Sequence, residues 1–372
     1  MSGKKTKILI AAGGTGGHIF PAQALAKQLA ARDEVQEILF AGHGLSHNRY
    51  FQQEQFIYQD VNSSTVFSTK WVSAIWKIGK GILESLKILK GFNPDIVIGF
   101  GSFHSFPVLA AAFMKRTPII LFESNCEPGK VNRLFSRCAE VSAIQFPEAS
   151  RRLSGKTVEI EMPLWKKDFY EDVDVEQARV YYGLDPSKLT FLIFGGSQGA
   201  VSINQTFCNT AARSDFPVEK FQVIHIAGSR TDLEEIRQIY RNLNIAACVK
   251  EFEDNMHCAW KAASLAICRS GAATFAELVF FEVPAILIPY PHAADDHQQK
   301  NAKFMQVHVG GAVVISESEL NEKTLSGAIQ YLLDPEKNQL FAMKERIKEF
   351  KNRNEKQDLC SLVCEISTRI KK

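Results

Sequence analysis

The segment "ILIAAGGTGGHIFPAQALAKQLA", residues 8–30, decides the fold. An apolar run is followed by four glycines around one threonine, and then by a histidine at the start of a helical pattern. A strand, a glycine turn and a helix in this order are typical of a parallel α/β unit, in which the free N–H groups at the helix start attract anions. The loop lacks GK[ST], and Ile19 stands where a GxGxxG that starts at Gly14 needs its third glycine. The sequence therefore predicts neither a Walker A loop nor a dinucleotide fingerprint.

The same alternation of apolar runs and helical patterns continues along the chain. The expected strands cover residues 7–12, 37–42, 95–101, 118–124, 141–146, 190–196, 221–228, 263–269, 284–290 and 311–316. Near-continuous apolar strands separated by helices predict parallel sheets covered on both faces. A second glycine loop, "FLIFGGSQGA" (191–200), opens the second half as the first loop opens the first half. We therefore expect an α/β fold of two doubly wound domains that face one another, residues 1–163 and 164–344, with a C-terminal helix at about 345–372 returning to the first.

The composition is that of a globular protein with more than one core. The chain has 372 residues, 45% of them apolar and 23% charged, and a formal net charge of +3. A single core rarely serves that length, and this charge is too small to indicate a nucleic-acid partner. No apolar run approaches the ~18 residues of a membrane-spanning helix, and the N-terminal run ends in glycines, as in a first strand rather than a signal peptide. Eight cysteines without a CxxC pair indicate reduced thiols in a cytoplasmic protein rather than disulfides or zinc.

Two segments of the second half carry side chains suited to a nucleotide sugar. In "CRSGAATFAEL" (268–278) a strand leads into a helix on which Thr274 and Glu277 share a face. Glu277 either accepts both hydroxyls of a ribose or is a solvated glutamate on an amphipathic helix. In "PYPHAADDHQQKNAKFM" (289–305), Gln298 and Asn301 share a face, and amides that both donate and accept suit sugar hydroxyls.

Two other patterns weigh against a metal site. His292 and His297 are five residues apart, which is the wrong spacing for one helical face. The DxD in "EDVDVE" (171–176), a pattern that some transferases use for manganese, is better interpreted as the capped start of a helix. We therefore predict no bound metal.

Taken together, these segments resemble the MurG family of N-acetylglucosaminyltransferases. The resemblance covers almost the whole chain and rests on five motifs in order, namely "GGTGGHIFPA" (13–22), "GGSQGA" with Asn204 (195–204), "EFEDNM" (251–256), "CRSGAATFAE" (268–277) and "AADDHQQKNA" (293–302). It implies a glycosyltransferase-B fold, two Rossmann-like domains with parallel sheets facing across a cleft. The implied reaction is inverting transfer of GlcNAc from UDP-GlcNAc to the C4 hydroxyl of MurNAc in undecaprenyl-pyrophosphoryl-MurNAc-pentapeptide, which converts lipid I to lipid II in peptidoglycan synthesis.

The resemblance also implies a role for individual residues and partners. The residues expected at UDP-GlcNAc are Thr15, Gly16, Gly17, His18, Asn125, Ser197, Gln198, Gly199, Phe252, Met256, Arg269, Ser270, Gly271, Ala272, Thr274, Glu277, His297, Gln298 and Asn301. The acceptor pyrophosphate is expected at Gly13, Gly14, Gly16 and Gly17, and the reacting centre at Thr15 and His18. UDP-GlcNAc is a substrate, so no cofactor is expected. The implied partners are UDP-GlcNAc, lipid I and an anionic membrane surface, with other cell-wall enzymes as further candidates and no nucleic acid.

His18 has two interpretations in this scheme. An alcohol is a poor nucleophile near neutral pH, and a histidine that removes its proton typically accelerates the reaction ~10²–10⁴-fold. The leaving UDP develops charge that helix N-termini and loop amides stabilise without a metal. In the alternative, His18 caps the helix or contacts phosphate, and an Asp or Glu elsewhere in the cleft is the base.

Three segments depart from the family pattern. Phe103 in "GSFHSFP" (101–107) lacks the usual tyrosine hydroxyl, and Phe122 stands where a histidine often precedes Glu123. "EMPLW" (161–165) occupies the usual G-N-P-x-R and so loses an asparagine and an arginine. Lys166 or Lys167 would replace that arginine only as a point charge.

The segment "KWVSAIWKIGKGILESLKILK" (70–90) predicts an amphipathic helix with apolar residues on one stripe and lysines opposite. It is either an ordinary core helix or an interfacial helix on anionic lipid. The residues expected at the membrane are Trp71, Val72, Ile75, Trp76, Lys77 and Lys80. Because the acceptor carries a polyprenyl tail, we expect a peripheral enzyme on the cytoplasmic face of the inner membrane.

Three other functions remain open. A UDP-GlcNAc 2-epimerase of the same fold would bind the same donor but gives no reason for a tryptophan-lysine helix. A diacylglycerol glycosyltransferase also joins a sugar nucleotide to a membrane lipid, and competition between acceptors would distinguish it. A non-catalytic nucleotide-sugar sensor would bind the donor without turnover.

Overall fold

The computed structural model describes residues 5–64, 71–164, 174–196, 199–353 and 356–371, with the side chains of residues 71 and 72 left out. The chain divides into two compact units, residues 1–165 with 356–372, and residues 166–355. We expected the boundaries at 163/164 and near 345. The structure places them at 165/166 and 355/356, and the Lys166 and Lys167 that we considered at the hinge lie outside the described residues.

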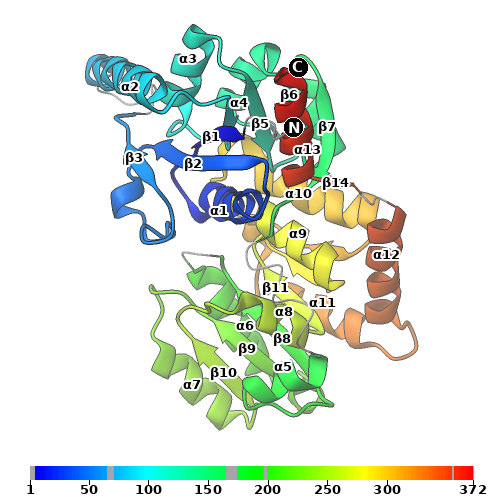
Figure 1. The fold of residues 1–372 in the computed structure, drawn as a ribbon. Helices are drawn as coiled ribbons and strands as arrows, with labels where there is room; N and C mark the ends of the chain where they lie inside the picture. The colour runs from blue at the N-terminus through cyan, green and yellow to red at the C-terminus, as the bar shows by residue number, and fades with distance from the viewer. Residues whose placement is uncertain (1–4, 65–70, 165–173, 197–198, 354–355, 372) are drawn as a thin grey trace. The chain divides into compact units, whose positions relative to one another are not determined.

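The first unit is built on one sheet of eight strands whose paired neighbours all run parallel (Figure 1). The strands are β1 (Thr6–Ala11), β2 (Val35–Gly42), β3 (Tyr58–Asp60), β4 (Ile96–Gly99), β5 (Ile119–Glu123), β6 (Val141–Ile144), β7 (Thr157–Glu161) and β14 (Gln357–Asp358). Their order is β14-β7-β6-β5-β4-β1-β2-β3. The chain thus steps outward from β1 to β3 and then crosses back to β4, as in a dinucleotide-binding fold.

Five helices cover this sheet. They are α1 (Gly16–Ala30), α2 (Trp71–Phe92), α3 (Phe106–Lys115), α4 (Lys130–Phe135) and α13 (Leu359–Ile370). Helices α2 and α3 pack against each other, and their buried residues share a core with Leu9, Leu39 and Val97 of the strands. Near-complete burial of β1 explains why its sequence is a continuous apolar run rather than an alternating one.

The second unit repeats this plan with six parallel strands. They are β8 (Leu189–Phe194), β9 (Phe221–Ile226), β10 (Ala247–Lys250), β11 (Leu265–Cys268), β12 (Ala285–Leu287) and β13 (Ala312–Val314), in the order β10-β9-β8-β11-β12-β13. The helices are α5 (Val175–Tyr181), α6 (Val201–Ala211), α7 (Leu233–Asn242), α8 (Met256–Ala262), α9 (Ala272–Phe281), α10 (His297–Phe304), α11 (Glu322–Leu333) and α12 (Gln339–Arg353). The predicted α/β class with two Rossmann-like domains is confirmed.

The C-terminal helix α13 belongs to the first unit. Lys371 Nζ donates to Thr6 Oγ1 at 2.8 Å, and Arg369 pairs with Glu140 at 3.0 Å. Helix α12, by contrast, buries Met343 and Ile347, and Met343 is part of the second unit's core. The return to the first unit therefore follows α12 rather than beginning within it.

Candidate functional site

The first glycine loop connects β1 to α1 at the carboxyl end of the sheet. Thr15 is the N-cap of α1 with extended backbone, and its exposed side chain makes no capping hydrogen bond. Gly14 has φ +89°, a conformation that favours glycine. A Cβ on Gly13 would lie 2.6 Å from the Cβ of His104, so this position also needs glycine. Gly16 and Gly17 form the first helical turn, where backbone N–H groups have no acceptor within the helix.

His18 is half-buried on the first turn of α1, and its Nδ1 lies 2.8 Å from the carbonyl oxygen of Phe100. A carbonyl oxygen only accepts, so the hydrogen-bond network assigns the proton of the neutral ring to Nδ1. The lone pair is then on Nε2. This tautomer gives His18 a basic nitrogen whose orientation is fixed by the backbone after β4.

Two further histidines lie at this loop, and the sequence analysis missed both. His104 Nδ1 is 2.7 Å from Ser102 Oγ, and the His104 ring stacks on the His43 ring with centroids 5.5 Å apart and planes 19° apart. Burial, with a smaller contribution from His43 and His18, lowers the pKa of His104 to about 4. The signal that would have found them is their position, since each follows a strand that neighbours β1 in the sheet.

Glu123 holds the loop that carries Asn125. Its Oε1 accepts the N–H of Asn125 at 3.0 Å, and its Oε2 accepts the N–H of Gly129 and the amide of Asn132, both at 2.9 Å. Burial raises the pKa of this carboxyl, and the hydrogen bonds oppose the rise. Asn125 is thus positioned by a buried carboxyl. Phe122 fills the space beside Phe100 with ring centroids 5.1 Å apart, so an apolar contact occupies the place of the family histidine.

In the second unit, the start of α9 and the start of α10 are joined by hydrogen bonds. Gly271 is the N-cap of α9, and the buried Ser270 donates from Oγ to the carbonyl of Gln298 at 2.8 Å. Asn301 Nδ2 donates to the carbonyl of Ser270 at 3.3 Å. The Oε1 of Gln298 accepts the N–H of Tyr290 at 3.0 Å. The structure therefore brings Ser270, Gln298 and Asn301 together.

The side chain of Arg269 is committed to its own unit. The guanidinium donates to the carbonyl oxygens of Ile288 and Pro289 at 3.2 and 3.3 Å, and pairs with Glu317. It also lies 3.3 Å from Ser202 Oγ, and Arg269 is 8% exposed. We expected Arg269 at UDP-GlcNAc, where the family resemblance places it beside the uracil. With its side chain held in this way, only the Arg269 backbone remains for that role.

Glu277 lies one turn inside α9, after Ala272 and the buried Thr274 at the helix start. The residue as a whole is half-buried. Desolvation raises the pKa of Glu277 to about 8, and the Trp260 indole opposes the rise. A carboxyl with so perturbed a pKa is a candidate for a functional site.

A buried hydrogen-bond chain supports the second glycine loop. His225 Nε2 lies 3.1 Å from Asn204 Oδ1, and His225 Nδ1 lies 2.7 Å from the Tyr240 hydroxyl. Asn204 Nδ2 then donates to the carbonyl of Ala227 at 2.8 Å. Gly199, at φ +74°, meets this carbonyl so closely that a Cβ would lie 2.6 Å from it. Asn204 and His225 therefore fix the backbone against which the loop is packed.

The remaining expected donor residues are dispersed over the second unit. Phe252 is 50% exposed, and Met256 is the first residue of α8. His297 begins α10, with its Nδ1 2.8 Å from the Ala294 carbonyl. Ser197 and Gln198 lie outside the described residues.

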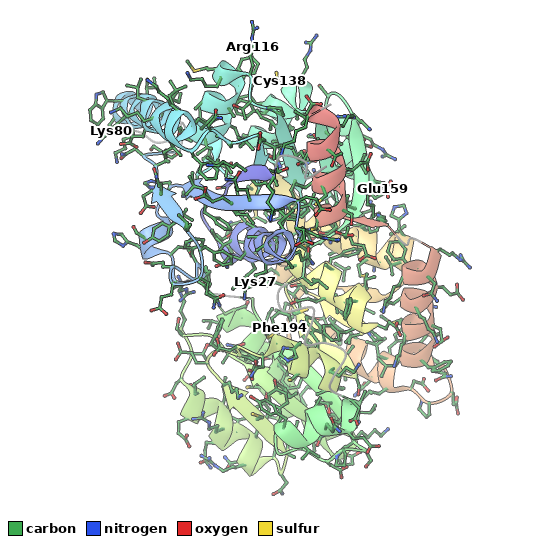
Figure 2. The ribbon with its side chains drawn as sticks, in the orientation of Figure 1. Lys27, Lys80, Arg116, Cys138, Glu159 and Phe194 are labelled. Atoms are coloured by element: carbon green, nitrogen blue, oxygen red, sulfur yellow. The ribbon has the colours of Figure 1, made fainter. Side chains whose placement is uncertain are left out.

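Helix α2 exposes a mixed apolar and basic face. Trp76 is 69% exposed, Ile75 54% and Leu83 62%, and Lys77 and Lys80 are exposed as well. The side of α2 that packs on α3 is buried, and Ile75 of the expected apolar stripe is exposed, as a membrane contact requires. Lys80, labelled in Figure 2, lies 5.8 Å from the centre of the Trp76 ring. The side chains of Trp71 and Val72 lie outside the described residues.

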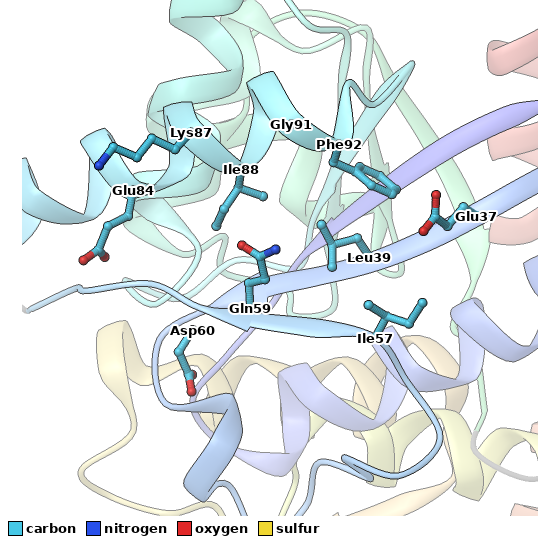
Figure 3. A pocket seen from close by; sticks show the side chains of 10 residues that line it. All are labelled: Glu37, Leu39, Ile57, Gln59, Asp60, Glu84, Lys87, Ile88, Gly91 and Phe92. Carbon is cyan, nitrogen blue, oxygen red and sulfur yellow. The ribbon is translucent and has the colours of Figure 1, made fainter.

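A hollow of about 590 Å³ lies elsewhere on the first unit, between α2 and the strands β2 and β3. Figure 3 shows Ile88 and Phe92 of α2 on one side of it and Leu39 of β2 on the other. Its polar lining consists of Glu37, Gln59, Asp60, Glu84 and Lys87. Three carboxylates against one lysine make it a poor site for an anionic substrate, and none of the expected site residues lines it.

A membrane-spanning helix and a metal-binding cluster are both absent from the described residues. No helix among them combines the length and the apolar character that a membrane crossing requires. No group of three or more histidine, cysteine, aspartate or glutamate side chains among them is arranged to hold a metal ion.

Comparison with known proteins assigns both units to one family. The N-terminal domain model of glycosyltransferase family 28 matches residues 8–144, and the C-terminal domain model of the same family matches residues 190–359. A protein of Protochlamydia amoebophila (strain UWE25) is 42% identical over 364 residues, which cover 97% of this chain and 96% of the relative. It is named UDP-N-acetylglucosamine--N-acetylmuramyl-(pentapeptide) pyrophosphoryl-undecaprenol N-acetylglucosamine transferase.

Two further relatives agree. A protein of the same name from Chlamydia trachomatis serovar L2 is 37% identical over 335 residues, or 89% of this chain and 91% of that protein. The crystal structure of Acinetobacter baumannii MurG superimposes with a TM-score of 0.76 at 25% identity, and the match covers 98% of this chain and 99% of that chain.

Proposed function

The chain belongs to glycosyltransferase family 28, and we propose from that premise that it transfers GlcNAc from UDP-GlcNAc to the C4 hydroxyl of MurNAc in undecaprenyl-pyrophosphoryl-MurNAc-pentapeptide. It is a MurG-type N-acetylglucosaminyltransferase of peptidoglycan synthesis, which forms lipid II from lipid I. The observation that carries this function is 42% identity over 97% of the chain to a transferase of that name.

His18 is the proposed base. The C4 oxygen of MurNAc forms a bond to the anomeric carbon of GlcNAc while the bond from that carbon to the UDP phosphate oxygen breaks, with inversion. The hydroxyl proton passes to Nε2 of His18, which the Nδ1 bond to the Phe100 carbonyl leaves as the basic nitrogen. Thr15, exposed at the helix N-cap, would contact the same reacting centre. The amides of Gly13, Gly14, Gly16 and Gly17 would meet the acceptor's pyrophosphate.

The donor site is proposed for the second unit. Glu277, ionised, would accept the two ribose hydroxyls, and the helix N-terminus at Gly271 and Ala272 would lie beside the uracil. Gln298 and Asn301, which hydrogen bonds attach to Ser270, would contact the GlcNAc hydroxyls. Further donor contacts are proposed for Thr274, Met256, Phe252, His297, Ser197, Gln198 and Gly199 of this unit and for Asn125 of the first. The charge that develops on UDP would be stabilised by loop amides near Gly199, so no cofactor enters the reaction.

Membrane contact is proposed for the exposed face of α2. Trp76 and Ile75 offer an aromatic and an aliphatic side chain to the lipid interface, and Lys77 and Lys80 offer charges to anionic headgroups. The acceptor's polyprenyl tail stays in the bilayer, so the enzyme must work at its surface. We therefore propose a peripheral protein on the cytoplasmic face of the cell membrane. Contacts with other cell-wall enzymes remain a prediction.

One assay tests the proposed reaction. Purified protein is incubated with UDP-GlcNAc and a short-chain lipid I analogue in the presence of EDTA, and UDP release and the disaccharide product are followed. We expect one disaccharide per UDP released, with no product from diacylglycerol and no epimerised sugar nucleotide from UDP-GlcNAc alone. Donor binding without turnover would support a sensor instead, and transfer to diacylglycerol in place of lipid I would overturn the proposed acceptor.

A further inference from the structure

Three histidines meet at the carboxyl end of the first unit's sheet, and the proposed reaction uses one of them. His18 lies on α1 after β1, His43 follows β2 directly, and His104 lies in the turn after β4. Strands β4, β1 and β2 are neighbours in the sheet, so the loops that follow them meet at one edge. Ligands of doubly wound folds bind at this edge.

His104 is the histidine most tightly built into the glycine loop. A Cβ on Gly13 would lie 2.6 Å from His104 Cβ, and a Cβ on Gly14 would lie 3.1 Å from its Nδ1. The face of the ring is covered by His43, whose own Nδ1 lies 3.0 Å from the Val61 carbonyl. A side chain at Gly13 would therefore displace His104, and one at Gly14 would crowd its ring.

The hydrogen bonds give the three rings different chemistry. His18 and His43 both face carbonyl oxygens with Nδ1, so their neutral rings carry the proton on Nδ1 and a lone pair on Nε2. His104 Nδ1 instead faces the Ser102 hydroxyl, which also lies 3.4 Å from the His104 N–H as an acceptor. We assign the proton of this hydroxyl to the hydrogen bond with Nδ1 of His104. His104 therefore carries its ring proton on Nε2 and is a donor there.

The Nε2–H of His104 has no acceptor among the residues that the structure describes. A neutral donor beside the amides of a glycine loop suits an anionic oxygen, because it adds a hydrogen bond without requiring protonation of the ring. It does not suit a base, because its free nitrogen already holds a proton. His18 and His104 thus supply complementary groups, an acceptor for the nucleophile's proton and a donor for an anion.

We propose that His104 is a further acceptor-binding residue, whose Nε2–H donates to a non-bridging oxygen of the acceptor's pyrophosphate beside Gly13 and Gly14. The inference rests on the proposed function, because it takes the lipid-linked pyrophosphate as the ligand. Ser102 is the positioning residue, since it holds the ring proton on Nε2. His43 supports the ring by stacking.

Two substitutions separate the nitrogen atoms of the ring. His104→Gln places an amide N–H near the position of Nε2, whereas His104→Asn places one near Nδ1. We expect His104→Asn to raise the acceptor KM about 10- to 100-fold, the loss of a hydrogen bond to a charged group, and His104→Gln to raise it about threefold or less. The donor KM should stay unchanged in both variants.

The matched control is His47→Gln, an exposed histidine on the same unit. Thermal unfolding of each variant reports folding. If the His104 variants do not fold, Ser102→Gly takes their place, since glycine tolerates the φ of +69° at this position, and a higher acceptor KM is again expected. Equal effects of His104→Asn and His104→Gln, or an unchanged acceptor KM in Ser102→Gly, overturn the inference. If the wild type transfers no GlcNAc to the analogue, the proposed function fails instead.

Discussion

The raised pKa of Glu277 predicts that donor binding depends on pH. The ionised carboxylate offers a charged acceptor oxygen to each ribose hydroxyl, and we take it as the form that binds the donor. Desolvation raises the pKa of Glu277 to about 8 in the free protein. At pH 7 about one molecule in eleven carries the ionised form, and at pH 8.5 about three in four do. Donor affinity should therefore rise with pH, by about eightfold between these two values.

Isothermal titration of UDP-GlcNAc into the protein without acceptor measures this effect. The ligand's diphosphate is fully ionised over the range, and stopping at pH 8.5 avoids deprotonation of the uracil ring. Binding at pH 7 should also release close to one proton, about 0.9, because the carboxyl must ionise. Repeating the titration in buffers with different ionisation enthalpies reports that proton directly.

Two variants complete the test. Glu277→Gln should bind the donor more weakly at pH 8.5, without the rise in affinity and without proton release. Glu251→Gln, an exposed position in the same unit, should behave as the wild type. Wild-type affinity that stays level from pH 7 to pH 8.5, with no proton released, would refute the assignment of Glu277 to the ribose.

Three other predictions concern the proposed base, the exposed face of α2 and the buried hydrogen-bond chain of the second unit. His18→Ala should keep donor affinity while kcat falls about 10²–10⁴-fold, and turnover close to wild type would remove His18 as the base. The double variant Ile75→Glu with Trp76→Glu should no longer sediment with anionic vesicles, but it should still transfer GlcNAc to a soluble acceptor analogue. Unchanged vesicle binding would exclude this face of α2 as the membrane contact. High salt should release the wild-type protein from the vesicles. His225→Leu should leave Asn204 without its buried partner, lower the free energy of unfolding in urea by about 2–5 kcal/mol, and raise the donor KM more than the acceptor KM. A denaturant midpoint equal to wild type would show that the buried chain contributes little.

Most of the strands that the sequence predicted are continuously buried, and the partly exposed β2 and β13 are exceptions. In β1 and β9 nearly every residue is buried. A strand that is buried on both faces has a nearly uninterrupted apolar sequence, so the sequence identifies it. The strands that it missed are short or partly exposed. β7 reads "TVEIE" with one buried residue, and β14 has two residues that pair with β7 only because the chain returns after α12. Such strands depend on their neighbours rather than on their own composition.

The candidate site was predictable where one segment carries both partners. Gln298 and Asn301 share a helix, and their common face was readable from spacing. The contacts of Arg269 were not predictable, because its partner Glu317 lies 48 residues further along the chain. The ion pair with Glu317 occupies the guanidinium, which the motif suggested for the donor. His104 was missed for the same reason, since its relation to Gly13 depends on β4 lying next to β1.

Helix α2 shows a different limit. Its sequence is apolar on more than one side, so periodicity identified an amphipathic helix without deciding which side faces the core. Packing on α3 decides it, and a close contact explains how. A Cβ on Gly81 would lie 1.8 Å from the carbonyl oxygen of Asn62, so this glycine side of α2 must face the chain after β3. Trp76 and Leu83 are then left outside, and the exposed surface is a consequence of where the small residue lies.

The histidines show how far the backbone decides the chemistry of a side chain. His18, His104 and His225 are the same residue type, yet each has the role that the atom opposite Nδ1 allows. A carbonyl opposite Nδ1 leaves the lone pair of neutral His18 on Nε2, as the proposed base requires, and a serine hydroxyl opposite Nδ1 fits the proposed donor role of His104 Nε2. Burial between Tyr240 and Asn204 lowers the pKa of His225 to about 3 and leaves it a neutral structural link. The sequence shows all three histidines but does not predict their different roles. The groups that determine those roles lie on other strands and helices of the fold.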